Sequence, residues 1–353
     1  MNVLCLRNNF TGGYHAFKTF YDEILDGFEK LGVNVFVADS VTEAVKFYEN
    51  ESVDFSLNIG KYFFFLDDRP LYDVFKIVNY EWIIDNPLKY NADTKSMYNR
   101  LIMIDSEFLS LDGFYRSDYM VLPLGGPHFE YYEVERKNAV LVPWRIKSLS
   151  DLTIKIEESP FQKEVFDFIH NYDYDSSYIS FFNQYLNECK SIKDHILFFR
   201  LTNDYIRADK RIRMVNAIHD YPVVIVTDDH CKEITGNNVS YLPTGDFLTT
   251  LDLQRQYRYV LNSNPNYYMS LHERVTHAIA NGAVVVTDEN ALLNDINFPL
   301  RIKQSNLGTL DELIHYADQN FVQLLNEQRN CVFEYRMENT LNKIIMNCHE
   351  LQV

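Results

Sequence analysis

Short apolar runs alternate with longer amphipathic segments along the whole chain. The first run is NVLCL, which precedes a glycine turn, an amphipathic segment ending at Gly32, and a second run, VNVFVAD. A strand, a glycine loop, a helix and another strand in this order are typical of a parallel sheet with crossover helices. The pattern continues through SVDFSLNIG, YEWIIDNP, RLIMIDS and DYMVLPLGG. It predicts a Rossmann-like N-terminal domain over residues 1–130.

A second alternation starts after a segment rich in Gly, Pro and charge. It opens with NAVLVPW and a helical stretch from about 149 to 211, and its later strands are predicted at PVVIVTDD, VSYLP, YRYVLNSNPN, GAVVVTDEN and PLRIK. A second Rossmann-like domain over 138–320 accounts for these elements, with a helical segment at 321–353 that is free to pack back on the N-terminal domain. The predicted fold class is α/β, with two Rossmann-like domains facing each other across a cleft.

Composition narrows the functional classes. The 353 residues suit two domains, and the formal net charge of -17 opposes a phosphate backbone, which excludes a general nucleic-acid partner. The five cysteines show no CxxC spacing, so a zinc knuckle or a disulfide framework is not indicated and a reducing cytoplasm fits best. No segment reads as a transmembrane span, and peripheral membrane association is left open.

The stretch SNPNYYMSLHERVTHAIANGAVVVTDEN concentrates the candidate chemistry. We expect a helix to begin at Ser270, a good N-cap, so that His272, Glu273 and Arg274 occupy its first turn. Unpaired N–H groups, the positive end of the helix dipole and the Arg274 cation together suit a diphosphate. Glu273 could accept hydrogen bonds from sugar hydroxyls, and His272 could donate one to a phosphate oxygen. An ordinary solvated first turn is the alternative.

Two further regions carry candidate residues. The segment YIRADKRIR places Arg207 and Arg211 one helical turn apart, where they could reach phosphates or simply form a solvated helix face. In the N-terminal domain, Gly12 and Gly13 would let the backbone approach a ligand closely. His15 at the following helix start and Asp85 at the end of WIID are equal candidates for a general base, and a surface His or a turn-capping Asp is the alternative for each.

The motifs also resemble a known family. The segment NPN…SLHERVTHAIANGAVVVTDEN, with the upstream YIRADKRIRMVNAIHDYPVVIV, resembles the C-terminal half of GT-B glycosyltransferases of the spore-maturation, CgeB-like type. The segments IIDNP and VLPLGG resemble parts of the N-terminal half of that group. The resemblance implies a bacterial, metal-independent transferase without a cofactor. Its second domain would hold a nucleotide-sugar donor, with UDP-sugar favoured, and its first domain a hydroxyl acceptor on a cell-surface glycan or glycoprotein.

Carried over by position, the resemblance implies a set of donor-binding residues. With the two upstream arginines the set is Asn264, Asn266, Ser270, His272, Glu273, Arg274, Gly282, Thr287, Asp288, Arg207 and Arg211. One departure stands out, because His277 occupies a position where many GT-B enzymes place an acidic residue for the ribose. His277 therefore favours an alternative, a catalytically silent nucleotide-sugar-binding partner of another transferase. A nucleotide-sugar epimerase would need two carboxylates, and only Glu273 and Asp288 offer a pair.

Overall fold

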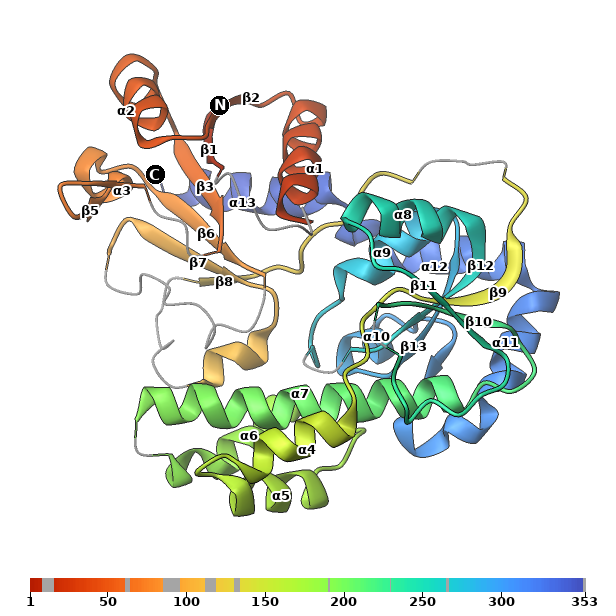
Figure 1. The fold of residues 1–353 in the computed structure, drawn as a ribbon. Helices are drawn as coiled ribbons and strands as arrows, with labels where there is room; N and C mark the ends of the chain where they lie inside the picture. Colours follow the sequence, from red (N-terminus) through yellow and green to blue (C-terminus); the bar gives the residue numbers. More distant parts are fainter. Residues whose placement is uncertain are drawn as a thin grey trace. The chain divides into compact units, whose positions relative to one another are not determined.

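The chain forms two compact α/β units, each built on its own parallel sheet (Figure 1). The computed structural model describes residues 1–7, 16–60, 64–84, 96–111, 119–129, 134–189, 191–228, 230–264 and 267–351. Unit 1 comprises Met1–His128, Asp246–Leu248 and Glu334–Val353, and unit 2 comprises Phe129–Gly245 and Thr249–Phe333. Two parallel sheets confirm the α/β class expected from the alternating pattern.

Unit 1 contains a six-stranded sheet in the order β2-β1-β3-β6-β7-β8. Every neighbouring pair in it is parallel. The strands are β1 (Asn2–Leu6), β2 (Asn34–Ala38), β3 (Phe55–Ile59), β6 (Asn79–Ile83), β7 (Asn99–Met103) and β8 (Tyr119–Val121). A small antiparallel hairpin of β4 (Phe65–Leu66) and β5 (Arg69–Pro70) follows β3. All six apolar runs predicted for the N-terminal domain thus contain strands of one sheet.

Helices α1 (Ala16–Lys30), α2 (Val41–Asn50) and α3 (Leu71–Phe75), with the 3₁₀ turn Ser106–Ser110, complete the N-terminal part of unit 1. Helix α1 ends before Gly32, whose φ of 68° allows the chain to reverse into β2. It buries Phe28 against Phe55 of β3, with ring centroids 6.3 Å apart. Helix α2 starts from Ser40, whose hydroxyl accepts the N–H of Glu43.

Unit 2 contains a six-stranded sheet in the order β11-β10-β9-β12-β13-β14, again parallel throughout. Its strands are β9 (Lys137–Val142), β10 (Val223–Val226), β11 (Val239–Leu242), β12 (Tyr257–Asn262), β13 (Val284–Asp288) and β14 (Arg301–Ile302). Strands β10 and β13 are buried at every residue, which explains the apolar sequence of β10 and of the first three residues of β13. When the six strands are numbered along the chain, they lie in the order 3-2-1-4-5-6, which is the strand order of a Rossmann sheet.

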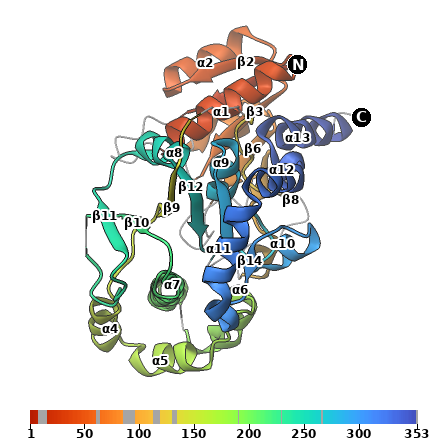
Figure 2. The same ribbon diagram turned by 90° about the vertical axis from the view of Figure 1, so that its right-hand side faces the viewer.

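The helical stretch expected from 149 to 211 is divided into several helices and runs further than predicted. It comprises α4 (Leu149–Glu157), α5 (Gln162–Asn171), α6 (Tyr178–Phe182), the 3₁₀ turn Asn183–Glu188 and α7 (Ile192–Asn216). Pro160 follows the end of α4, and Ser191 caps the start of α7. Figure 2 looks down the axis of α7, along which α4 and α5 pack. An aromatic cluster around Phe168 joins these helices.

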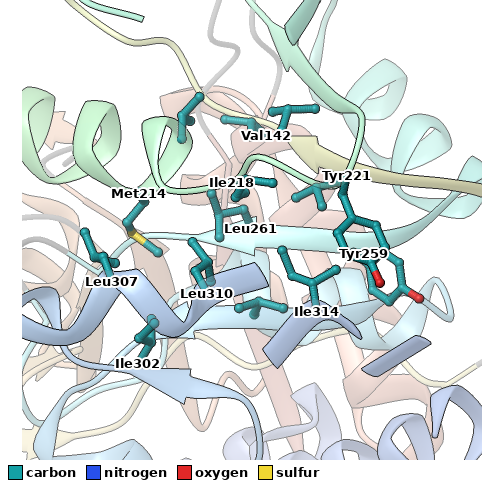
Figure 3. Packing of buried hydrophobic residues seen from close by; sticks show 14 of the residues in the cluster. Val142, Met214, Ile218, Tyr221, Tyr259, Leu261, Ile302, Leu307, Leu310 and Ile314 are labelled. Carbon is teal, nitrogen blue, oxygen red and sulfur yellow. The ribbon is translucent and has the colours of Figure 1, made fainter. Parts of the chain in front are cut away.

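The remaining helices of unit 2 cover its sheet. They are α8 (Phe247–Gln256), which starts in the short segment grouped with unit 1, α9 (Glu273–Ala280), α10 (Ala291–Asp295), the 3₁₀ turn Gln304–Thr309, α11 (Leu310–Gln319) and α12 (Phe321–Val332). Figure 3 shows the core of this unit, where Leu310 and Ile314 of α11 meet Leu261 of β12 and Met214 and Ile218. This core holds the loops at the strand ends in fixed positions.

The C-terminal segment divides between the two units. Helix α12 packs on β13 and α9 in unit 2, whereas α13 (Met337–Leu351), after the 3₁₀ turn Phe333–Tyr335, packs on α1 in unit 1. A Cβ atom at Gly27 of α1 would lie 2.8 Å from Cδ1 of Leu341, so the glycine permits the close approach of the two helices. Across the described ranges, no helix has the length and apolar character needed to cross a membrane.

Candidate functional site

The candidate residues of unit 2 gather where its strand order reverses. Strands β9 and β12 are neighbours in the sheet, while the chain runs from β9 outward to β10 and returns to β12. Open α/β sheets bind ligands at the carboxyl ends of the strands at such a point. Here Trp144, just after β9, donates its indole N–H to the carbonyl of Leu261 in β12, at 3.1 Å. The two strand ends are therefore fixed to each other.

The helix that follows β12 begins two residues later than the sequence predicts, because its N-cap is His272 and not Ser270. Helix α9 starts at Glu273, and His272, with φ -72° and ψ 135°, is its N-cap. Ser270 instead lies in the preceding loop, where its carbonyl accepts the side-chain N–H of Asn290 at 2.8 Å. The hydroxyls of Ser270 and Ser263 are buried and make no hydrogen bond within the part of the chain that the structure describes. Both serines lie in the chain between β12 and α9.

His272 and Glu273 form a tight pair at this helix start. Nδ1 of His272 lies 2.8 Å from Oε2 of Glu273 and 3.2 Å from the backbone N of Arg274. Nδ1 accepts the backbone N–H of Arg274, so in the neutral ring the proton is on Nε2, and the contact with Glu273 becomes an ion pair only when the ring is protonated. Burial lowers the pKa of His272 to about 4 despite the opposing effect of Glu273. Burial raises the pKa of Glu273, but His272 and Arg274 outweigh it and bring that pKa to about 2.

Arg274 connects the helix start to the ends of β12 and β13. Its Nη1 donates to Oδ1 of Asn262 at 3.0 Å, and the Asn262 amide donates to Oγ1 of Thr287, also at 3.0 Å. Asp288 accepts the backbone N–H of Asn264 at 2.6 Å, and burial raises the pKa of its carboxyl group. Asn264, Thr287 and Asp288, all predicted to bind the donor, thus lie in one buried network that includes Arg274.

Two arginines of α7 lie close to this network. Arg211 is buried, donates to the carbonyl of Arg145 at 2.7 Å, and lies 5.0 Å from the ring centroid of Trp144. Burial lowers the pKa of Arg211 well below its usual value, and the neighbouring charges of Arg207 and Arg274 lower it further. The alternative of a solvated helix face is therefore wrong for Arg211. Cations from two separate segments share one region, and they favour an anionic ligand.

Lys210 is a neighbour of this site that the sequence did not single out. It is only 4% exposed, lies 5.8 Å from the ring centroid of Tyr172, and is close enough to Asp288 for each to affect the pKa of the other. Burial nevertheless lowers the pKa of Lys210. Asn262, which holds Arg274, was also missed, and its only sequence signal is a polar residue at the end of an apolar strand.

Other predicted site residues lie elsewhere or outside the described ranges. Gly282 follows the last turn of α9, at the opposite end of the helix from Glu273, so the structure does not support its place among the donor-binding residues. Its φ is 82°, and a Cβ atom there would lie 2.5 Å from Nη2 of Arg136. The glycine serves a tight turn. Five predicted site residues lie outside the described residues: Asn266, Asp85, His15, Gly12 and Gly13.

His277 takes part in the helix rather than in a ligand pocket. It is 0% exposed, and its Nδ1 lies 2.7 Å from the carbonyl oxygen of Glu273, one turn earlier in α9. Because a carbonyl only accepts, Nδ1 donates this hydrogen bond. The imidazole therefore occupies the buried side of α9.

Comparison with known proteins identifies the fold. No protein-family model and no curated protein sequence matches the chain. Among solved structures it is similar to AviGT4, a glycosyltransferase involved in avilamycin A biosynthesis, with 12% identity, a TM-score of 0.57, and coverage of 99% of this chain and 97% of that one. Sucrose-phosphate synthase from Thermosynechococcus elongatus gives 8% identity, a TM-score of 0.53, and coverage of 99% and 98%. The fold is GT-B.

A further GT-B structure is an α-glucosyltransferase in complex with UDP and a 13-mer DNA. It shares 8% identity with the chain, at a TM-score of 0.50 and with 99% of each chain covered. At identities this low, the structural similarity shows the fold alone, and the substrates are argued from the site. The membership of the CgeB-like group remains a prediction.

Proposed function

We propose that the protein is a glycosyltransferase that moves a sugar from a nucleotide-sugar donor to a hydroxyl group of a cell-surface glycan or glycoprotein. The observation that carries the proposal is the cluster of Arg207, Arg211 and Arg274 at the switch point of a GT-B sheet. A partly buried cluster of like charges is unfavourable by itself, and a bound diphosphate would neutralise it.

The three arginines would act in two ways, some by direct contact with the diphosphate and one through its charge alone. Arg274 and Arg207 are partly exposed, so they are the groups that would touch the diphosphate. Arg211 is buried and already donates to the carbonyl of Arg145, so it would contribute its positive charge without touching the diphosphate. As the bond to the sugar breaks, negative charge grows on the departing diphosphate, and cations fixed beforehand stabilise it. The buried Ser270 hydroxyl is a further donor near the same helix start.

His272 and Glu273 are suited to the sugar or the ribose. With Nδ1 accepting the backbone N–H of Arg274, neutral His272 carries its proton on Nε2, which can donate a hydrogen bond to a phosphate or hydroxyl oxygen. Glu273 remains ionised over the physiological range because its pKa is about 2. The pair thus offers one hydrogen-bond donor and one hydroxyl-accepting carboxylate beside the diphosphate cations.

We place the acceptor on the N-terminal domain. Asp85 and His15 are the candidates for the base that removes the acceptor proton, and Gly12 and Gly13 would allow close approach of the backbone. The arginine cluster supplies the charge stabilisation that a divalent cation provides in other transferases, so we propose a metal-independent reaction without a cofactor. Five thiols without a disulfide favour the cytoplasm, and we leave peripheral association with a membrane within the proposal.

UDP-sugar is the favoured donor. UDP is the nucleotide in the complex of the similar α-glucosyltransferase. We do not extend the DNA of that complex to this chain, because a net charge of -17 opposes nucleic acid. A glycan or glycoprotein acceptor is compatible with that charge.

A catalytically silent nucleotide-sugar-binding partner of another transferase is the second candidate, favoured by His277 at the expected acidic position. Incubation with UDP-, GDP-, CMP- and dTDP-sugars, followed by measurement of released nucleotide, separates the two. Release from one donor in the presence of a glycan acceptor, unchanged by EDTA, is the expected result. Tight binding of a nucleotide sugar without release under any acceptor would establish the silent candidate.

A further inference from the structure

The guanidinium of Arg274 is held by a neutral side chain at the end of β12. Nη1 of Arg274 donates to Oδ1 of Asn262 at 3.0 Å, and Asn262 is 0% exposed. A carboxylate at this position would also fix the guanidinium, but it would neutralise the charge and compete with an anionic ligand. An amide fixes the group without adding a countercharge.

The surrounding network determines which way the Asn262 amide points. The Thr287 hydroxyl lies 3.2 Å from the carbonyl of Asp288, to which it donates its single proton. Its oxygen can then only accept, and both Asn262 and Asn264 donate their amide N–H groups to it at 3.0 Å. Asn262 Nδ2 also donates to Oδ1 of Asn264 at 2.8 Å. With Nδ2 committed on that side, Oδ1 of Asn262 faces Arg274 as an acceptor.

Asp288 anchors the other end of this network. Its Oδ1 accepts the backbone N–H of Asn264 at 2.6 Å, which fixes the chain just after β12. Asp288 is 1% exposed and Thr287 is 0% exposed, so neither presents a surface to a large ligand. Their hydrogen bonds are directed at the loop and at Asn262.

We propose that Asn262 is a positioning residue that aims the Arg274 guanidinium at the leaving diphosphate, with Thr287 and Asp288 setting the orientation of Asn262. This inference rests on the proposed function, in which Arg274 contacts the donor. It assigns Thr287, Asp288 and Asn264 a role one step removed from the donor. Asn262 acts on binding only through Arg274.

A double-mutant cycle on UDP binding tests the inference. We expect Arg274→Ala to weaken the binding of UDP about 30-fold and Asn262→Leu about 5- to 10-fold, each measured by calorimetry. In the Arg274→Ala background, Asn262→Leu should cause no further loss, because its effect passes through the missing guanidinium. Asn262→Asp should weaken UDP binding more than Asn262→Leu does, since it adds a charge that opposes the phosphate. Asn171→Leu, on the exposed end of α5, is the matched control and should bind UDP as the wild type does.

A second readout in the absence of ligand keeps the inference separate from the proposed function. In the wild type, NMR signals of the Arg274 guanidinium N–H groups should show slow rotation, and Asn262→Leu should make it fast. Unchanged signals, or an equal loss of UDP affinity from Asn262→Leu with and without Arg274, would overturn the inference. Normal UDP binding by Arg274→Ala would instead overturn the proposed function, and the guanidinium signals then decide the positioning role alone. If Asn262→Leu does not fold, Thr287→Val removes the oxygen that orients Asn262 and takes its place.

Discussion

Nδ1 of His272 lies 2.8 Å from Oε2 of Glu273, and both groups are held in their physiological charge state by the fold. The pKa of His272 is lowered to about 4, so the unfolded chain, with an ordinary value near 6.5, binds more protons between these values. The free energy of unfolding should therefore fall as the pH drops from 6.5 to 4. The pKa of Glu273, about 2, extends the loss below pH 4.5.

We expect the imidazole of His272 to account for about 2 kcal/mol of lost stability between pH 7 and pH 5. Urea unfolding of the wild type and of His272→Gln at both pH values measures this contribution as the difference between the two proteins. The remaining histidines are common to both proteins and cancel. An identical pH dependence in the two proteins would show that the imidazole is protonated equally in the folded and unfolded chain.

Arg274→Ala should reduce nucleotide binding much more than it reduces stability. The substitution removes a partly exposed side chain and one hydrogen bond to Asn262, which corresponds to about 1 kcal/mol of unfolding free energy. Loss of a charged contact to a diphosphate should cost about 2 kcal/mol of binding free energy. Thermal melting and UDP titration on the same samples give the comparison. A large drop in melting temperature with unchanged UDP affinity would assign Arg274 a purely structural role.

Gly282→Ala should destabilise the protein and leave nucleotide binding unchanged. The φ of 82° is unfavourable for alanine, and the new Cβ atom would displace Arg136, whose Nη2 donates to the carbonyl of Asn281 at 2.6 Å. The two effects together should cost about 2–3 kcal/mol in urea unfolding. Gly308→Ala is the control, because no atom lies within 4 Å of its added Cβ. A loss of UDP affinity together with the loss of stability would show that Gly282 belongs to the nucleotide-binding site.

Lys210→Met should destabilise the protein by about 3 kcal/mol, because it removes the positive charge that most favours the ionised form of the buried Asp288 carboxyl group. The double variant Lys210→Met with Asp288→Asn should regain most of the lost stability. The amide still accepts the N–H of Asn264 and carries no charge. Urea unfolding of the two single variants and the double variant measures the coupling. Additive losses would mean that Lys210 and Asp288 do not compensate each other.

Two substitutions in the N-terminal domain test which residue is the general base. Either Asp85→Asn or His15→Ala, but not both, should abolish sugar transfer while leaving UDP affinity within about twofold of the wild type, because the base acts on the acceptor. Transfer rates and UDP titrations are measured for each variant. Normal turnover by both variants would show that neither Asp85 nor His15 is the general base.

The local sequence predicted the elements well where burial is uniform. Strand β10 and the first three residues of β13 are apolar throughout because both faces of a parallel sheet are covered. The start of α9 differs from the prediction, since its N-cap is His272 rather than Ser270. A serine is a good cap only where its backbone is free to start a helix, and here the carbonyl of Ser270 is held by Asn290.

By itself, the sequence determined the two α/β units and the concentration of His272, Glu273 and Arg274 at one helix start. These features follow from periodicity and from residue types next to one another in the chain. Only the tertiary structure decided that Arg211, expected on a helix face, is buried beside Trp144, and that Asn262 holds Arg274 through an amide oriented by Thr287. Such contacts join residues that are far apart in the sequence, and packing, not local pattern, determines which of them meet.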